Sequence, residues 1–175
     1  ESNEKLYENI KNFDFQPKEF FSFDNGEGIN INAWMIKPAN FDENKKYPVI
    51  FDIYGGPGHQ SVLNEWDYMN AWHQLMCANG YIIVSVDNRG TGGRGEEFKK
   101  CTYLQLGKYE TIDQIAGAKY ISNLKYVDES RIGIWGWSFG GYLTLLCMTK
   151  GADLFNTGIA VAPVTNWRYY DNIYT

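Results

Sequence analysis

Cysteine, histidine and long apolar runs are scarce in this sequence, and each scarcity argues against a class of protein. The chain of 175 residues has three cysteines and two histidines. Cys77, Cys101 and Cys147 are widely spaced and form no C-x-x-C pair, which argues against a disulfide framework and a structural metal site. We therefore interpret the cysteines as packing residues or free thiols. No stretch reaches the roughly 18 apolar residues that a membrane-spanning helix needs.

A dense run of lysine or arginine is also missing. The formal net charge is −5 at pH 7, so the composition argues against nucleic acid or an anionic membrane as the partner. With 44% hydrophobic residues the chain is able to bury a real core, and its surface is typical of a soluble enzyme.

Apolar residues recur with the spacing of strands and helices through most of the chain. Residues 20–24 and 29–37 flank the turn-forming cluster Asn25-Gly26-Glu27-Gly28 and predict an antiparallel hairpin. Nearly continuous apolar runs predict strands buried on both faces, at residues 47–54, 81–86, 132–135 and 157–161. Helical spacing is found at residues 66–77, 112–124 and 138–150. The order predicts a hairpin leading into a parallel α/β sheet with helices on both faces.

The motif Gly136-Trp137-Ser138-Phe139-Gly140 has the G-x-S-x-G form of a nucleophile elbow and follows a predicted strand. The elbow is a strained turn between strand and helix that exposes the serine hydroxyl above the sheet. The small residues at both ends of the motif allow the backbone to turn tightly.

Serine is a poor nucleophile without a histidine base and an acid to orient that base, and in this fold both follow the serine in the chain. No histidine follows Ser138, because His59 and His73 both precede it. Asp153 and Asp171 come too soon after the serine to orient a base. We therefore expect the chain to be part of a longer enzyme, incomplete at its C-terminus, whose triad aspartate and histidine follow Thr175.

Two donors for an oxyanion are predicted near the elbow. The first is the backbone N–H of Phe139, at the start of a helix whose dipole favours negative charge. The second comes from Tyr54-Gly55-Gly56-Pro57-Gly58, which ends a strand where esterases of this fold carry an H-G-G-G loop. Tyr54 replaces that histidine, and its phenol is able to donate a hydrogen bond directly.

Other motifs have structural interpretations. Residues 90–95 match G-x-G-x-x-G after a strand, but no clear amphipathic helix follows, which disfavours dinucleotide binding. Asp87-Asn88-Arg89-Gly90 is interpreted as a loop fixed by a pair of arginine and carboxylate. His59 and His73 are interpreted as surface or helix-face residues rather than general bases.

Residues 135–142 and 162–171 together closely resemble the prolyl oligopeptidase family of serine peptidases, and in particular its dipeptidyl peptidases. The likeness extends through Tyr47-Pro48, residues 54–57, residues 87–92 and Asp113-Gln114-Ile115. This resemblance implies an α/β-hydrolase domain paired with a β-propeller, an enzyme that releases dipeptides from peptide N-termini after proline or alanine. Residues 1–16 would then be a linker from the preceding propeller domain, and residues 17–175 the N-terminal portion of the catalytic domain.

Carried over to this sequence, the resemblance makes Ser138 the nucleophile and assigns the oxyanion hole to the Tyr54 hydroxyl and the Phe139 amide. The Phe139 ring and four further residues match positions that line the proline pocket: Val164, Trp167, Tyr170 and Tyr174. Two departures are mild: Phe139 stands where many relatives have tyrosine, and Gly55 where alanine is frequent. No cofactor or metal is implied, and we expect the 175-residue chain alone to be inactive.

The residues leave other interpretations open. The longer protein could be another serine hydrolase, such as an acylaminoacyl peptidase or an esterase, or a non-catalytic relative that acts as an interaction protein. The chain could also be an ordered or excised part of an enzyme. The resemblance alone implies peptide substrates with proline or alanine at the second position, a homodimer, and a periplasmic, secreted or membrane-anchored location facing outward.

Overall fold

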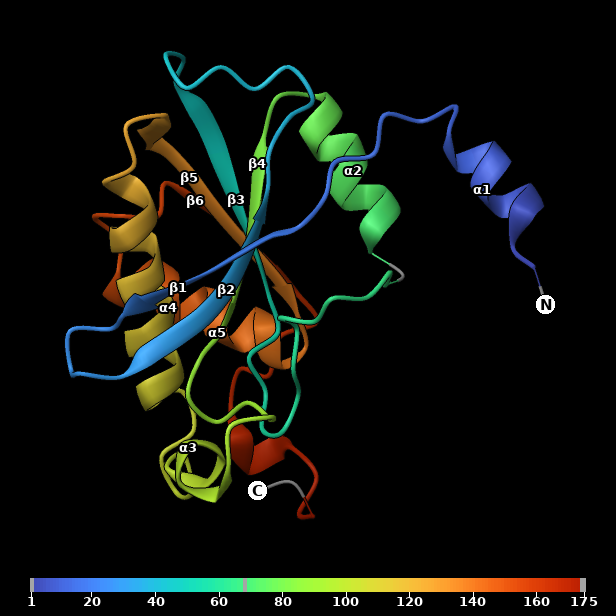
Figure 1. Cartoon of the computed structure of the whole chain (residues 1–175). Coiled ribbons are helices and arrows are strands. Elements are labelled where there is room, and N and C mark those ends of the chain that lie inside the picture. Colours follow the sequence, from blue (N-terminus) through green and yellow to red (C-terminus); the bar gives the residue numbers. More distant parts are fainter. Residues whose placement is uncertain (1, 68, 174–175) are drawn as a thin grey trace.

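The computed structural model describes residues 2–67 and 69–173. Its strands are β1 (Glu19–Asp24), β2 (Asn30–Ile36), β3 (Tyr47–Ile53), β4 (Ile82–Asp87), β5 (Val127–Trp137) and β6 (Thr157–Val161). Its helices are α1 (Glu4–Ile10), α2 (Asn70–Ala78), α3 (Glu96–Lys100), α4 (Lys108–Ser122), α5 (Phe139–Lys150) and the short 3₁₀ helix η1 (Trp167–Tyr169). Figure 1 shows one twisted sheet with helices on either side.

The six described strands form one sheet in the order β1-β2-β4-β3-β5-β6. The predicted hairpin is confirmed, because β1 and β2 pair antiparallel, with Phe23 opposite Ile31. The Asn25 side chain closes the turn by accepting hydrogen bonds from the backbone N–H groups of Glu27 and Ile29. β2 then pairs antiparallel with β4, and β4, β3, β5 and β6 run parallel, as expected for strands joined by helical crossovers.

The two faces of the sheet bury different apolar clusters. On one face α4 and α5 cover a large core that includes Phe51, Ile134 and Leu143. On the other face α2 covers a smaller cluster that includes Trp34 and Cys77. Figure 1 shows α2 on the opposite side of the sheet from α4 and α5. Both faces of the central strands β3 and β4 are therefore covered, and their near-continuous apolar sequence is explained.

The sequence prediction was wrong for β6, which is not buried on both faces. Its residues are exposed or only half-buried, and Ile159 is 62% exposed. Among the described strands β6 pairs only with β5 and lies at the edge of the sheet, where α5 covers a single face. An apolar run therefore predicted a strand correctly but gave no information on its neighbours.

Three helices also differ from the predictions. α2 begins at Asn70 and not at residue 66, and before it the Asp67 carboxylate accepts a hydrogen bond from the Met69 N–H at 2.8 Å. α1 lies within residues 1–16, where no pattern was found; none of its residues is buried. α3 follows Gly95 as a helix of five residues, too short to produce a clear apolar stripe.

Candidate active site

Ser138 lies at the junction of β5 and α5, since β5 ends at Trp137 and α5 begins at Phe139. Its backbone has φ 57° and ψ −114°, a conformation that non-glycine residues rarely adopt and that costs about 1–3 kcal/mol. The Ser138 N–H donates to the Val161 carbonyl at 2.9 Å, and its own carbonyl accepts from the Tyr142 N–H at 3.0 Å. Neighbouring β6 and the first turn of α5 thus hold the serine in a strained turn, as the elbow motif predicts.

The glycines of the motif are required by close approaches of backbone to backbone. A Cβ atom at Gly136 would lie 2.5 Å from the Gly140 carbonyl, and one at Gly140 would lie 2.2 Å from the Ile53 carbonyl oxygen. A Cβ atom at Gly141 would lie 2.9 Å from the Val161 carbonyl oxygen. The elbow is therefore packed directly against the ends of β3 and β6, and only glycine permits this packing.

Tyr54 follows β3 and reaches the elbow from that neighbouring strand. The Tyr54 and Phe139 ring centroids are 6.3 Å apart, and the Tyr54 Cα would lie 3.0 Å from a Cβ atom at Gly140. Gly56 lies against both rings, because a Cβ atom there would be 2.6 Å from Tyr54 Cε1 and 3.3 Å from Phe139 Cγ. The two predicted sources of oxyanion donors, the Tyr54 side chain and the residue after Ser138, are therefore neighbours.

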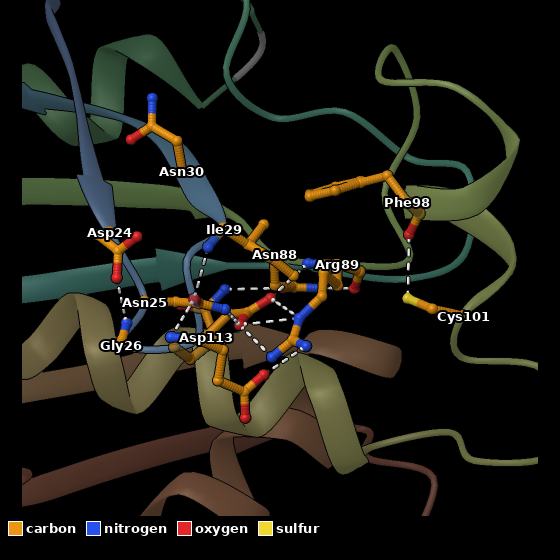
Figure 2. Close-up of polar contacts among 12 residues, drawn as sticks. Asp24, Asn25, Gly26, Ile29, Asn30, Asn88, Arg89, Phe98, Cys101 and Asp113 are labelled. Carbon is orange, nitrogen blue, oxygen red and sulfur yellow. Dashed lines mark hydrogen bonds and ion pairs between the residues drawn. The ribbon is translucent and has the colours of Figure 1, made fainter.

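A buried polar cluster that includes Arg89 and Asp113 follows β4 (Figure 2) and is hydrogen-bonded to the Tyr54 loop, residues 54–58. The Arg89 guanidinium binds the Asp113 carboxylate of α4 through Nε and Nη2 at 2.8–3.1 Å, and the Arg89 N–H donates to the same carboxylate. The prediction of a loop fixed by arginine and carboxylate is thus confirmed. Gly58 N–H donates to the Gly90 carbonyl at 2.9 Å, and Gly92 N–H donates to the His59 carbonyl at 3.0 Å. The loops after β3 and β4 consequently form one unit.

Behind this cluster, α4 contains a carboxyl group that faces no solvent. Glu110 is fully buried; its Oε2 accepts from the Gly107 N–H at 3.0 Å. Burial raises the pKa of Glu110 from its ordinary value of 4.5 to about 7, and the nearby Asp113 carboxylate contributes in the same direction. The turn that Glu110 fixes meets α5, where the Tyr142 hydroxyl donates to the Leu106 carbonyl at 3.0 Å.

The segment after β6 brings several predicted pocket residues together. The Trp167 ring contacts Phe139 and Tyr170 at centroid distances of 5.6 Å, and contacts Tyr142 at 5.2 Å. Val164 is 9% exposed, and Tyr170 is 42% exposed. The predicted pocket residue Tyr174 lies outside the described residues. The aromatic cluster formed by Phe139, Tyr142, Trp167 and Tyr170 therefore includes the residue directly after Ser138.

Comparisons with known proteins decide the family. A sequence model of the prolyl oligopeptidase family matches residues 66–175. The chain belongs to this family. A probable dipeptidyl-aminopeptidase B of Arthroderma benhamiae is 46% identical over 176 residues, which cover 100% of this chain and 19% of that protein. A probable dipeptidyl peptidase 4 of Aspergillus flavus is 40% identical over 175 residues, 99% of this chain and 23% of that protein.

The fold is that of the α/β-hydrolase domain of this family. The crystal structure of Porphyromonas gingivalis dipeptidyl peptidase 4 superposes with a TM-score of 0.92 and 48% sequence identity, covering 99% of this chain and 24% of that chain. A putative dipeptidyl aminopeptidase IV from Bacteroides ovatus superposes with a TM-score of 0.89 at 38% identity. The chain thus spans about a fifth to a quarter of the length of the prolyl oligopeptidase relatives that it matches.

Of the two histidines, which were interpreted as surface or helix-face residues, His73 lies on the buried face of α2 and His59 lies at the surface. His73 is 2% exposed, its Nε2 pairs with the Asp52 carboxylate, and its ring packs edge-on against Trp34 at 5.2 Å. His59 is exposed, with its ring 4.6 Å from the Tyr54 ring. The apolar stripe on α2 correctly indicated that His73 lies on a helix face. The stripe could not indicate Asp52, the partner of His73 on β3, because the two residues are 21 positions apart in the chain.

One feature beside Ser138 escaped the sequence analysis. Trp137 is 62% exposed although it ends a strand, and with Tyr54 it lines a cavity of about 630 Å³. The available signal in the sequence was a large aromatic residue directly before Ser138. Among the described residues no cluster of three or more histidine, cysteine and acidic side chains could hold a metal. Within the same residues no helix combines the length and apolar character needed to cross a membrane.

Proposed function

We propose that this chain supplies the nucleophile and the oxyanion hole of a serine exopeptidase that releases N-terminal dipeptides after proline or alanine. The observation that carries the proposal is the strained backbone of Ser138 at the elbow, directly beside the Tyr54 loop. Membership of the prolyl oligopeptidase family and the names of the relatives support the same reaction class. Because the chain spans about a fifth of those relatives, the activity belongs to a longer protein.

The proposed reaction proceeds through an acyl-enzyme. A histidine of the longer protein, oriented by an aspartate, takes the proton of the Ser138 hydroxyl as Oγ attacks the carbonyl carbon of the second residue. The Phe139 N–H and the Tyr54 hydroxyl donate to the oxyanion that forms. The C–N bond breaks as the histidine returns the proton to the leaving amine. Water then attacks the ester in the same way, the dipeptide leaves, and Ser138 regains its proton.

The preference for proline is proposed to come from the aromatic cluster with Val164 and Tyr174. Flat aromatic walls suit the rigid pyrrolidine ring, which loses little conformational entropy on burial, while a bulkier side chain is excluded. The contacts of Trp167 with Phe139 and Tyr170 support this assignment, because they join the segment after β6 to the residue after the nucleophile.

The test is the hydrolysis of a Gly-Pro chromogenic amide by the full-length enzyme. We expect Ser138→Ala to abolish turnover and Tyr54→Phe to lower kcat about a hundredfold, since an oxyanion donor is lost. Tyr169→Phe is the matched control, because Tyr169 is 83% exposed and its hydroxyl should not matter. Activity that survives Ser138→Ala would refute the proposed function, and a silent Tyr54→Phe would remove Tyr54 from the oxyanion hole.

Two further assays separate the alternatives. Acyl-amino acid amides and short esters, assayed beside the Gly-Pro amide, distinguish a dipeptidyl peptidase from an acylaminoacyl peptidase or an esterase. The 175-residue chain alone is expected to be inactive; hydrolysis by it that Ser138→Ala blocks would contradict this expectation.

The remaining proposals concern the longer protein and rest on the family resemblance. Residues 1–16 are proposed to link the catalytic domain to a propeller, and Figure 1 shows α1 standing apart from the sheet and its other helices. The longer protein is proposed to be a homodimer that acts on peptides outside the cytoplasm. Sedimentation of the purified enzyme and fractionation of cells would test these two statements.

A further inference from the structure

Asn88 connects the Tyr54 loop to the core of the molecule. The residue follows β4, and it is fully buried. Its side-chain Nδ2 donates to the Gly55 carbonyl at 3.0 Å and to the Arg89 carbonyl at 2.7 Å. Gly55 is the residue after Tyr54, so one buried amide fixes the peptide group directly behind the predicted oxyanion donor.

The close approach of Asn88 depends on glycine at position 55. Gly55 has φ +67°, and a Cβ atom there would lie 2.3 Å from Asn88 Oδ1. Because Gly55 has no side chain, the Asn88 amide is able to approach the Gly55 backbone and bind its carbonyl oxygen. Gly55, which stands where alanine is frequent, therefore leaves the space that the Asn88 side chain occupies.

The peptide group whose carbonyl Asn88 binds is followed by Gly56, which contacts the Tyr54 ring. The Gly55 carbonyl belongs to the peptide that joins Gly55 to Gly56, and Gly56 packs against the Tyr54 and Phe139 rings. Rotation of this peptide would displace Gly56 and remove the surface on which the Tyr54 ring rests. The orientation of the Tyr54 hydroxyl is consequently coupled to the hydrogen bond from Asn88.

Helix α4 in turn fixes Asn88. Gln114 Nε2 donates to Asn88 Oδ1 at 2.8 Å and to the Val86 carbonyl at 3.1 Å, while the adjacent Asp113 binds Arg89. Figure 2 shows Asn88 and Arg89 above α4, with Asp113 reaching toward them. Each polar atom of the Asn88 amide thus has a partner, and the amide is held in one orientation.

We propose that Asn88 is a positioning residue for the oxyanion hole: its amide holds the Gly55–Gly56 peptide so that the Tyr54 hydroxyl is in place before substrate binds. The proposal rests on the proposed function and deepens it. A displacement of about 1 Å in a catalytic group is able to cost up to a hundredfold in rate, so a buried amide distant from the substrate has a measurable effect on turnover.

A double-mutant cycle in the full-length enzyme tests the proposal, with kcat and KM measured on a Gly-Pro chromogenic amide. We expect Asn88→Ala to lower kcat about tenfold and to change KM less than about twofold. In a Tyr54→Phe background, where no hydroxyl is left to position, the same substitution should lower kcat less than about twofold. A structural role alone would give the same loss in both backgrounds.

The control and a second variant keep the test decisive. Gln74→Ala removes a buried amide of α2 outside this cluster, which donates to the Gln16 carbonyl at 2.8 Å, and it should leave kcat within about twofold. Gln114→Met removes the donor to Asn88 Oδ1, and should lower kcat about threefold, again only when Tyr54 is present. If Asn88→Ala does not fold, the cycle with Gln114→Met decides.

Additive losses in the cycle, or an unchanged kcat in the Asn88 and Gln114 variants, would overturn the positioning role while Ser138 and Tyr54 behave as proposed. Activity that survives Ser138→Ala would overturn the proposed function itself, and the positioning role with it. The two failures are therefore distinguishable.

Discussion

The two sides of the candidate site are held in place by different means. On one side, Ser138 and Tyr54 stand on turns where backbone packs on backbone, with the buried Asn88 amide and the Asp113 carboxylate behind them. On the other side, residues 162–173 form a largely exposed segment, in which Tyr169 is 83% and Ile173 is 98% exposed. Contacts between aromatic rings, above all those of Trp167, join this segment to the elbow.

This difference matches the demands of the two proposed tasks. Stabilisation of an oxyanion needs donors placed within a few tenths of an ångström, and such placement requires rigid, buried support. Recognition of a proline ring needs shape and apolar surface, which side-chain packing provides with more tolerance. We therefore expect substitutions on the first side to affect folding and turnover, and those on the second side to affect specificity with little loss of stability.

The largest expected effect is at Gly140. Gly140→Ala would place a Cβ atom 2.2 Å from the Ile53 carbonyl oxygen, and neither backbone is able to move without displacing β3 or α5. We expect no folded protein, judged by soluble yield and circular dichroism. Gly80→Ala is the control, because Gly80 has φ +86° but a Cβ atom there would meet no atom within 4 Å, and it should cost only about 1–2 kcal/mol. Equal behaviour of the two variants would contradict the explanation of the elbow.

The next effect concerns the buried ion pair. Asp113→Asn keeps the size of the side chain but leaves the Arg89 guanidinium without its buried carboxylate, and should lower the free energy of unfolding by about 4 kcal/mol. Urea unfolding of the 175-residue chain would measure the change. Asp128→Asn loses the ion pair with the exposed Arg131 but keeps an oxygen that accepts from the Ser130 N–H and hydroxyl, and it should cost less than about 1 kcal/mol. A loss at Asp113 as small as the one at Asp128 would argue against rigid support from α4.

The raised pKa of Glu110 predicts that the free energy of unfolding depends on pH. In the unfolded chain its carboxyl ionises near pH 4.5, whereas in the folded protein burial raises its pKa to about 7. Between these values the folded state binds more protons, so the free energy of unfolding should fall as the pH rises from about 4.5 to about 7. The fall should be of the order of 3 kcal/mol. Glu110→Gln should flatten this part of the curve in urea unfolding at several pH values; an unchanged slope would refute the assignment.

The smallest effect on stability is expected in the exposed segment. Tyr170→Ala removes a ring 5.6 Å from Trp167 that is already 42% exposed, and should cost about 1 kcal/mol in urea unfolding. In the full-length enzyme the same change should raise KM for a Gly-Pro amide more than it lowers kcat, because a wall of the proposed pocket is lost. A large loss of stability with unchanged KM would contradict the expectation that this segment serves specificity and contributes little to stability.

Much of this arrangement could be predicted from the sequence. The hairpin, the four apolar strands and the elbow follow from local patterns, because the alternation of apolar residues and the glycines around Ser138 are contiguous in the chain. The short helices α1 and α3 were not predicted, since a helix of one or two turns has too few residues to produce periodicity. The exposure of β6 was missed because burial depends on neighbouring strands and not on the strand itself.

The sequence by itself determined the strands, the longer helices and the chemical type of the proposed nucleophile, because a strand, a tight turn and a helix are encoded by residues next to one another. The tertiary structure alone decided that Asn88, 33 residues away from Gly55, holds the Gly55 carbonyl, and that Asp52 pairs with His73. The first contact arises because the parallel strands β3 and β4 bring their carboxyl ends to one edge of the sheet, and the second because α2 packs on a face of the sheet. Neither approach is encoded by residues that are adjacent in the chain.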